Sequence, residues 1–301
     1  MNTAAAPRSI EQYLAALRAA LAGEDPALIQ DALYDAEEYL RAEVRANPDK
    51  SEADVLEVIA STYGAPDEVA EAYRTTERQV RTALAPPKPK EHRTALGRFF
   101  GVFGDSRAWT ALFYALLALG TGIVYFTVVV TGLSISAGLA VLIIGIPFFL
   151  LFVGFTRVLA LAEGRLVEGL LGQRMPRRPP YPQKGKPVMQ RIKDMLVDRR
   201  TWTTMLYFLL MLPLGIVYFT ATVTGFAIGI GLIVAPVAAL FAPQGGIHVD
   251  EVYYAPDPMI GLVAIPLGIL VITLMLHLMR GIGTIHGGLA KHLLVAQSRA
   301  D

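Results

Sequence analysis

The hexapeptide GIVYFT occurs twice in this chain, at Gly122–Thr127 and at Gly215–Thr220, 93 positions apart. Upstream residues repeat at the same offset: Asp105 with Asp198, Trp109 with Trp202, and Tyr114 with Tyr207. Downstream the offset becomes 123, which pairs Arg157 with Arg280, Gly164 with Gly287, and Leu170 with Leu293. The sequence from about residue 98 onward therefore contains two copies of one unit, and the second copy carries about 30 additional residues.

Apolar segments dominate both copies. Residues 108–161 contain one charged residue, Arg157, and residues 201–241 and 259–279 contain none. The whole chain is 53% hydrophobic and only 18% charged, whereas charged residues make up about a quarter of a typical soluble domain. This composition excludes an ordinary soluble globular protein and indicates a membrane protein.

Segment lengths predict four membrane-spanning helices. A helix needs about 20 apolar residues to cross the hydrocarbon core of a bilayer. Residues 108–161 are long enough for two crossings with a turn near Gly132–Ser136, while Trp202–Gly225 and Met259–Met279 make a third and a fourth. The shorter segment Phe226–Phe241 is interrupted by two glycines and a proline. We interpret it as re-entrant, interfacial or an extension of the third helix.

Charge placement predicts the orientation of these spans. Basic residues gather at 93–107, at 157–200 and after 280, whereas the loop at 243–258 carries only acidic charges. The positive-inside rule then places both termini and the basic segments in the cytoplasm and the acidic loop outside. Each copy runs in, out and back in, and is expected to end in an amphipathic cytosolic helix, at 163–172 and 286–295. The two copies are therefore parallel.

The front of the chain differs in charge from the rest. Residues 1–78 hold 16 acidic and 7 basic side chains, whereas the remainder holds 10 acidic and 20 basic. Helix-start signals occur at Ser9, Asp25, Ser51 and Pro66, where a capping side chain or a first-turn proline precedes apolar residues at helical spacing. These signals predict a small four-helix bundle.

The expected fold is all-α, with a small cytosolic helical bundle followed by a four-span transmembrane domain of two parallel two-helix repeats. Its parts are a cytosolic acidic domain at 1–80, a proline-rich linker at 81–97, a first membrane repeat at 98–175, a cytosolic basic loop at 176–197, and a second membrane repeat at 198–301, which includes the short apolar segment and the external loop.

Residues Ile10 to Arg74 resemble the HAAS-type helical signalling domain of bacterial membrane proteins. The resemblance rests on YLAALRAAL, DALYDAEEYLRAEV and KSEADVLEVIASTYGAPDEVAEAYR in this order. Tyr63 stands where the family more often has leucine. The resemblance implies a cytosolic signalling domain and a place in the bacterial cytoplasmic (inner) membrane.

Residues 98–297 resemble the bacterial "putative sensor" membrane domain, often found upstream of histidine kinase modules. The matching stretches are GIVYFTVVVTGLSISAGLAVLIIGIPFFLL with AEGRLVEGLLG in the first copy, and the corresponding stretches of the second. This resemblance implies a membrane-embedded sensory role and supplies no ligand. No kinase motif follows, so we expect any output to pass through the acidic helical domain.

Candidate binding residues lie at matching places in the two copies. Tyr125 and Tyr218 lie mid-span, either in a buried seam between the copies or in a pocket for an apolar or lipid-like ligand. Arg157 and Arg280 lie at the inner ends of the returning helices. There they act either as interfacial anchors or as a binding site for a lipid head group.

Two further sets of residues are candidates for contacts outside the membrane core. His248, Asp250 and Glu251 form either an ordinary polar loop or an external ligand-binding or proton-sensitive site. The acidic residues Asp31, Asp35, Glu37, Glu38 and Glu43 form either a solvated surface or a contact for a basic cytosolic partner.

No motif indicates an enzyme. The chain has no cysteine, and His286 and His292 are six residues apart, which is not the spacing of a metal-binding pair. We expect no catalytic residues, metal or cofactor, and no nucleic-acid binding. The function favoured is a sensor that couples an envelope or lipid stimulus to a cytosolic regulatory protein. A small transporter or lipid-handling protein, or an oligomeric membrane scaffold, is the alternative, and membrane lipids and a second copy are the other expected partners.

Overall fold

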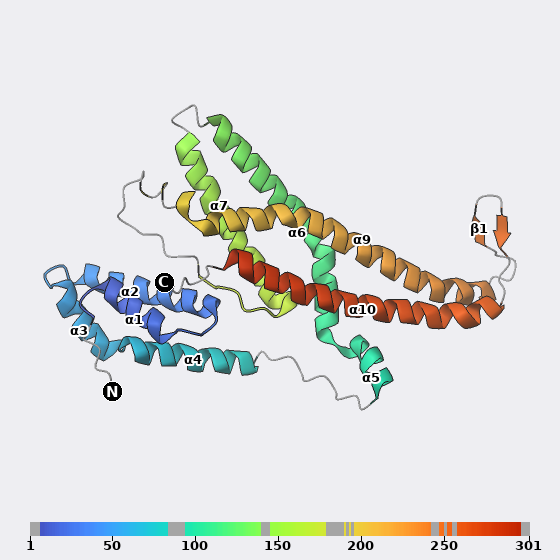
Figure 1. Ribbon diagram of the computed structural model, residues 1–301, viewed down its shortest axis with the longest axis horizontal. Helices are drawn as coiled ribbons and strands as arrows, with labels where there is room; N and C mark the ends of the chain where they lie inside the picture. The colour runs from blue at the N-terminus through green and yellow to red at the C-terminus, as the bar shows by residue number, and fades with distance from the viewer. Residues whose placement is uncertain are drawn as a thin grey trace.

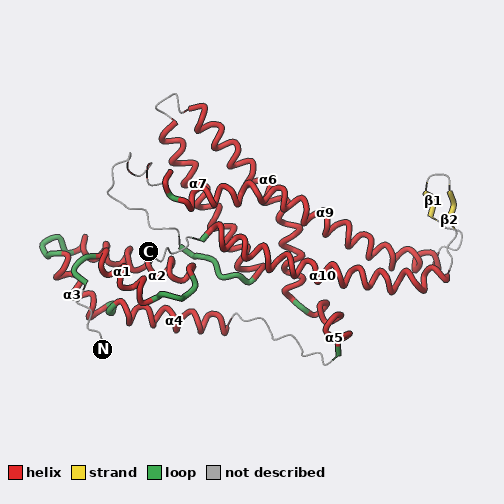
Figure 2. Tube along the Cα trace, in the orientation of Figure 1, coloured by secondary structure: helices red, strands yellow, loops and turns green. Residues whose placement is uncertain are grey.

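The computed structural model describes residues 7–83, 94–139, 145–178, 190, 193, 196–241, 247–249, 252–254 and 258–295. Nearly all of them are helical (Figures 1 and 2). Four short helices form a bundle beside the end of the last helix, and four long helices make up the rest. The predicted all-α class is confirmed.

The N-terminal bundle consists of α1 (Ile10–Ala20), α2 (Pro26–Ala46), α3 (Glu52–Thr62) and α4 (Pro66–Ala83). Each begins where the sequence signals predict. The hydroxyl of Ser9 accepts a hydrogen bond from the Gln12 amide, and the carboxylate of Asp25 accepts one from the Ala27 amide. Such caps stabilise a helix by about 1 kcal/mol each, because they satisfy amides that have no partner within the helix.

The bundle closes around one apolar core. Tyr13, Leu17, Leu21 and Leu40 are fully buried in it. The Tyr13 hydroxyl donates to the carbonyl of Gly64 at 2.8 Å, which ties α1 to the turn between α3 and α4. Gly64 has φ +113°, a conformation that favours glycine. Burial, together with neighbouring Tyr63 and acidic side chains, raises the pKa of Tyr13 well above its ordinary value.

Beyond this bundle, α5 (Ala95–Phe100) and η1 (Gly101–Gly104) lead into α6 (Ser106–Gly138). The remaining long helices are α7 (Gly145–Leu166), α9 (Arg199–Phe241) and α10 (Pro258–Leu294). All four are long and apolar enough to cross a membrane. This agrees with the predicted number of spans.

The turn predicted at Gly132–Ser136 lies too early in the sequence. Helix α6 continues through this segment to Gly138, and α7 starts at Gly145. Gly132 is a packing residue, because a Cβ atom at this position would collide with the ring of Phe152 on α7. The glycine thus lets the two helices of the hairpin approach, as small residues do in membrane helices.

Phe226–Phe241 is an extension of the third helix, which was one of the three interpretations. Helix α9 has 43 residues and contains Pro213 and Pro236 without a break. At about 1.5 Å per residue it is about 65 Å long, which is twice the roughly 30 Å thickness of a hydrocarbon core.

The amphipathic segments at 163–172 and 286–295 are not separate helices. Residues 286–294 belong to α10, and residues 163–166 to α7, which continues into the π-helical turn η3 (Val167–Leu171). Glu163 and His286 are fully buried. One face of each segment packs in the interior of the helical assembly, where Glu163 and His286 both bind the hydroxyls of Tyr114 and Tyr207.

Helices α6 and α9 cross closely through the repeated hexapeptides. A Cβ atom on Gly122 would collide with the backbone of Met211, and one on Gly215 with the backbone of Ala118. These two contacts are related by the offset of 93. The α6–α7 and α9–α10 hairpins leave the crossing in different directions (Figure 1).

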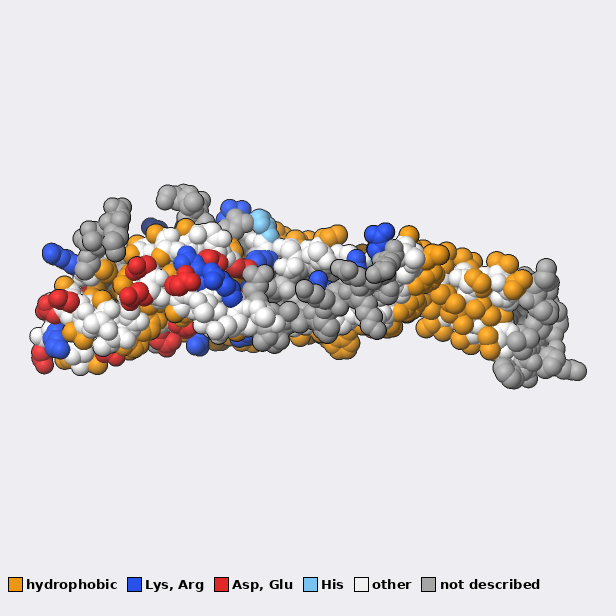
Figure 3. Space-filling view, turned by 90° about the horizontal axis from the view of Figure 1, so that it is seen from below, with side chains coloured by type: hydrophobic (Ala, Val, Ile, Leu, Met, Phe, Trp, Pro, Cys, Tyr) orange, Lys and Arg blue, Asp and Glu red, His pale blue; other side chains and the backbone are white. Residues whose placement is uncertain are grey.

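The loop between α9 and α10 contains a short antiparallel hairpin, β1 (Ile247–Val249) and β2 (Val252–Tyr254), which the sequence analysis did not predict. It lies at the far end of the α9–α10 hairpin (Figure 1). Apolar side chains cover the described part of the α9–α10 hairpin, whereas charged side chains gather over the N-terminal bundle (Figure 3).

Candidate functional site

Six buried side chains meet where the four long helices come together. We call them the Tyr-Glu-His cluster; they are Tyr114 and Tyr125 of α6, Glu163 of α7, Tyr207 and Tyr218 of α9, and His286 of α10. Glu163 and His286 are both 0% exposed. A polar group buried without partners costs several kcal/mol in an apolar environment, so the contacts among these six residues decide whether the arrangement is stable.

Glu163 accepts three tyrosine hydroxyls. Tyr114 and Tyr207 donate to its Oε1 at 2.6 and 2.8 Å, and Tyr125 donates to its Oε2 at 2.9 Å. The same hydroxyls of Tyr114 and Tyr207 lie 2.7 and 2.9 Å from His286 Nε2. The carboxylate and the imidazole are therefore bridged by two tyrosine hydroxyls.

The number of available protons determines the direction of these bonds. A tyrosine hydroxyl has one proton, so when Tyr114 and Tyr207 donate to Glu163 their oxygens can only accept from His286. His286 then carries one proton on Nε2, which the two hydroxyl oxygens share, and its Nδ1, 3.3 Å from the Tyr218 hydroxyl, accepts from Tyr218. A second proton on the imidazole, at Nδ1, reverses this last bond.

The members of the cluster correspond between the two copies. The offset of 93 pairs Tyr114 with Tyr207 and Tyr125 with Tyr218, and the offset of 123 pairs Glu163 with His286. The four tyrosines thus form two identical pairs. The two copies differ in the cluster only where one has Glu163 and the other has His286.

The sequence analysis identified Tyr125 and Tyr218 and missed the other four members. Both of these tyrosines are buried. Tyr125 contacts Glu163, and Tyr218 contacts His286. Glu163 falls in a segment predicted only as an amphipathic helix, and the sequence raised His286 only as a metal ligand. Applying the offset of 123 to every polar residue would have paired Glu163 with His286 in advance.

Arg157 and Arg280 form equivalent ion pairs between the copies. Arg157 contacts Asp198 at 3.4 Å, and Arg280 contacts Asp105 at 3.1 Å. Each arginine on a returning helix thus binds the aspartate that caps the first helix of the other copy. Trp109 and Trp202, which are half-exposed, each donate to a carbonyl six residues earlier.

Of the predicted external site, Asp250 and Glu251 lie outside the described residues, and His248 lies in β1. In the described part of the chain, no three His, Cys, Asp or Glu side chains are grouped as metal ligands.

The acidic residues of α2 meet the basic segment that follows η3. Asp31 accepts from the Arg174 guanidinium at 2.8 Å and from the backbone amides of Arg177 and Arg178 at 2.8 and 2.9 Å. Arg178 also pairs with Asp35 at 3.0 Å. Asp31 is only 5% exposed. We call this set, together with the bonds below, the docking contact.

Two other long helices contribute to the docking contact. Lys291 of α10 binds Asp25 at 2.5 Å, and Arg200 of α9 donates to the side chain of Gln30 at 2.9 Å. Burial lowers the pKa of Arg174, but its bonds to Asp31 and nearby carboxylates raise the pKa above its ordinary value, so this side chain remains charged.

The other predicted acidic residues are not part of the docking contact. Glu37 pairs with Arg41 on the same helix at 2.9 Å. Glu38 is exposed and Glu43 is half-buried near the end of α2. The structure therefore divides the predicted acidic surface into a covered part and an open part.

Comparison with known proteins gives one match. Residues 114–294, more than half of the chain, match the family described as "Putative sensor". This range includes every member of the Tyr-Glu-His cluster, and helices α1–α4 lie outside it. Neither a curated protein nor a solved structure matches the chain. With all four candidate membrane spans and its buried cluster overlapping this match, the chain belongs to the Putative sensor family.

Proposed function

We propose that this protein is a signal-transduction protein in which the packing of the membrane helices controls how much of the acidic N-terminal bundle is exposed. The observation that carries the proposal is that two helices hold both the cluster and the docking contact. Glu163 precedes Glu168 by five residues, and His286 precedes Lys291 by five. Both intervals lie at the C-terminal ends of the returning helices: 163–168 runs from α7 into η3, and 286–291 lies within the last turns of α10.

The last residue of each five-residue interval, Glu168 or Lys291, forms ion pairs that hold the N-terminal bundle in place. Lys291 binds Asp25 directly. Glu168 binds Arg177 at 3.1 Å and lies 3.8 Å from Arg174, so it helps to position the two arginines that surround Asp31. A rotation or shift of α7 or α10 at the cluster therefore moves the residues that hold α2.

The cluster is the place where such a shift can begin. It joins all four long helices by hydrogen bonds at the crossing from which the two hairpins diverge. Closely packed interfaces tend to switch between discrete arrangements, because intermediate packing leaves polar groups unpaired. An envelope or lipid stimulus that changes the angle between the hairpins would act on this junction.

The output of the switch is the release of Asp31 and Asp35. In the docked state Arg174, Arg177 and Arg178 occupy them. When α2 separates from this segment, the two carboxylates become available to a basic surface of a cytosolic regulatory protein. The proposal includes a signalling role for α1–α4 of the kind that their sequence resemblance to HAAS-type domains implies. We further propose a non-enzymatic role, a bacterial inner-membrane location with both termini in the cytoplasm, and assembly with further copies.

The proposal is tested by measuring whether the cluster controls the docking contact. The chain has no cysteine, so cysteines at Ser61 and Ile285, both exposed, can carry spin labels for distance measurements in nanodiscs. We expect Glu163→Gln to broaden the distance distribution between α3 and α10. Asp31→Asn should broaden it too, since it breaks the contact directly, and Glu38→Gln on the same helix should not. An unchanged distribution in Glu163→Gln, with a broadened one in Asp31→Asn, would contradict the coupling.

A further inference from the structure

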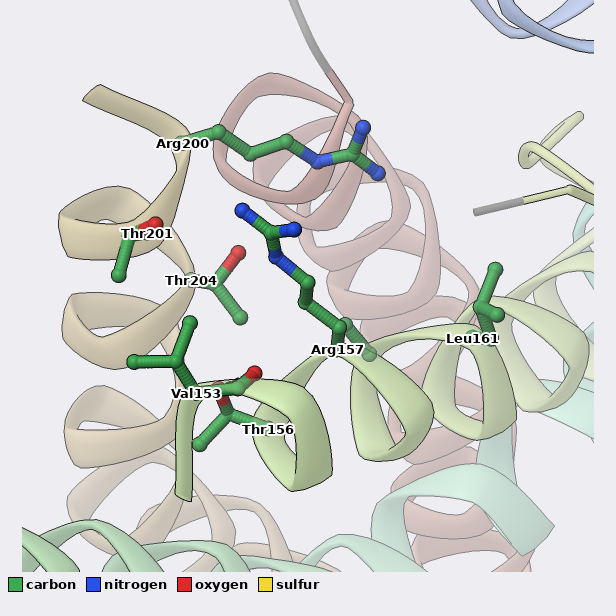
Figure 4. A pocket seen from close by; sticks show the side chains of 8 residues that line it. Val153, Thr156, Arg157, Leu161, Arg200, Thr201 and Thr204 are labelled. Carbon is green, nitrogen blue, oxygen red and sulfur yellow. Dashed lines mark hydrogen bonds between the residues drawn. The ribbon is translucent and has the colours of Figure 1, made fainter. Parts of the chain in front are cut away.

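A small pocket lies beside the docking contact, between α7 and the first turn of α9. Arg157 and Arg200 lie next to each other at this pocket, and Thr156, Thr201 and Thr204 line it (Figure 4). The hydrogen bonds among the described residues use one N–H of each guanidinium, to Asp198 and to Gln30. A guanidinium has five N–H donors, so donors for an anion are in excess here.

The hydroxyl of Thr201 is a second, independent sign of a ligand. Thr201 is 6% exposed, and its hydroxyl has no hydrogen-bond partner in the part of the chain that the structure describes. A buried polar group without a partner is uncommon in a native structure and needs an explanation. An anion held by the two arginines would supply the missing acceptor.

The equivalent place in the other copy lacks the polar lining. The same offsets replace Thr201 by Ala108, Thr204 by Ala111 and Thr156 by Met279, and all three replacements are buried. The positions of Arg157 and Arg200 are taken by Arg280 and Arg107. The arginines are thus common to both copies, whereas the polar lining is particular to one, which indicates a site and not only an interfacial anchor.

The position of the pocket along the membrane normal indicates which anion it binds. Trp202, next to Thr201 in the sequence, is 48% exposed, and tryptophan is enriched at the level of lipid head groups. The phosphate of a phospholipid lies at this level. We propose that Arg157, Arg200 and Thr201 form a binding site for the phosphate of an anionic phospholipid. Because Arg200 also donates to Gln30, the site links this lipid to the docked bundle, a link that rests on the proposed function.

Tryptophan fluorescence tests the site directly. The chain has two tryptophans, so Trp109→Phe leaves Trp202 beside the pocket, and Trp202→Phe leaves its counterpart Trp109. The full-length variants are placed in phosphatidylcholine vesicles with increasing fractions of brominated phosphatidylglycerol or brominated phosphatidylcholine. Each arginine close to anionic lipid favours it roughly fivefold. We expect Trp202 to be quenched by phosphatidylglycerol at an about thirtyfold lower fraction than by phosphatidylcholine, and Trp109 to show a smaller preference.

Substitutions assign the preference to this pocket. Arg157→Gln with Arg200→Gln should abolish it at Trp202, and Arg280→Gln should leave it intact. Thr201→Val keeps the shape of the side chain and should raise the fraction of phosphatidylglycerol needed to quench Trp202 about tenfold, roughly the value of one hydrogen bond to a charged group. Equal preference at both tryptophans, a preference that survives in the double arginine variant, or an unchanged fraction in Thr201→Val overturns the site.

A competition measurement distinguishes binding of a lipid phosphate from binding of free inorganic phosphate. Excess inorganic phosphate at constant ionic strength should leave the preference of Trp202 for phosphatidylglycerol unchanged. If it removes the preference, the pocket binds free phosphate and the assignment to a lipid is wrong. The quenching does not depend on the docking contact, so its failure refutes this inference and leaves the proposed coupling to the spin-label experiment.

Discussion

Exchanging Glu163 and His286 tests whether the two copies form one interchangeable cluster. The two side chains occupy positions related by the offset of 123 and share the hydroxyls of Tyr114 and Tyr207. Glu163→His places two imidazoles in the cluster, and His286→Glu places two carboxylates there. The double exchange restores one acid and one imidazole among the same four tyrosines.

The magnitudes follow from the geometry. Because Glu163 Oε1 and His286 Nε2 both lie within 3 Å of the same hydroxyls, two carboxylates here would be about 5 Å apart and repel by about 3 kcal/mol at an effective dielectric constant near 20. Glu163→His removes the acceptor of three tyrosine hydroxyls and leaves Tyr125 without its carboxylate. Breaking a buried polar pair on one side typically costs about 3–5 kcal/mol. The double exchange should recover most of either loss.

The free energy of unfolding is measured by SDS titration in mixed micelles, followed by far-UV circular dichroism. We expect each single exchange to lower it by about 3 kcal/mol or more, and the double exchange to lower it by less than either. The coupling energy from this double-mutant cycle is the quantity of interest. If the losses of the single exchanges add within about 0.5 kcal/mol in the double exchange, the positions are not equivalent and the reasoning fails.

Three further predictions concern the packing, the docking contact and the pH dependence. Gly215→Ala should destabilise the crossing of α6 and α9 by about 2 kcal/mol or more, measured by the same titration, because its Cβ meets backbone atoms; Gly231→Ala, with nothing near its Cβ, should be neutral or stabilising. Lys291→Met should increase the rate of hydrogen exchange in α2 by up to about fivefold, since one ion pair to Asp25 is lost; no change in this rate would mean that Lys291 does not hold α2. The raised pKa of Tyr13 means that the folded state keeps a proton that the unfolded chain loses above about pH 10. The contribution of Tyr13 to the free energy of unfolding is therefore fully present below that pH and falls above it by about 1.4 kcal/mol per pH unit. Tyr13→Phe should make the decline of stability less steep in alkaline unfolding curves.

The sequence predicted the helical elements well where local chemistry determines them. Ser9, Asp25 and Ser51 cap the helices that they were expected to start, because capping depends on residues within one turn. The four spans were predicted because a bilayer requires long apolar segments. The turn was placed too early, near Gly132–Ser136, since glycine in a membrane helix serves close packing as well as breaks, and the ring of Phe152 shows that Gly132 serves packing.

The candidate sites were predicted only in part. The repeat predicted a role for Tyr125 and Tyr218 because both lie in the repeated hexapeptide GIVYFT. Glu163 and His286 were not predicted as site residues, since they differ in chemistry and lie in segments that were interpreted as amphipathic cytosolic helices. Asp31 was identified as one of several acidic residues, but its three donors come from a segment more than 140 positions away.

The amino-acid sequence by itself determined the helical class, the number of apolar spans, the acidic and basic halves and the correspondence of the two copies. Those properties follow from composition, periodicity and spacing along the chain. Only the tertiary structure decided which polar residues meet: Glu163 with His286 through two tyrosines, Arg157 with Asp198, and Asp31 with the segment after η3. These contacts join residues far apart in the sequence, and the physical reason is that buried polar groups must find partners wherever the crossing helices bring them together.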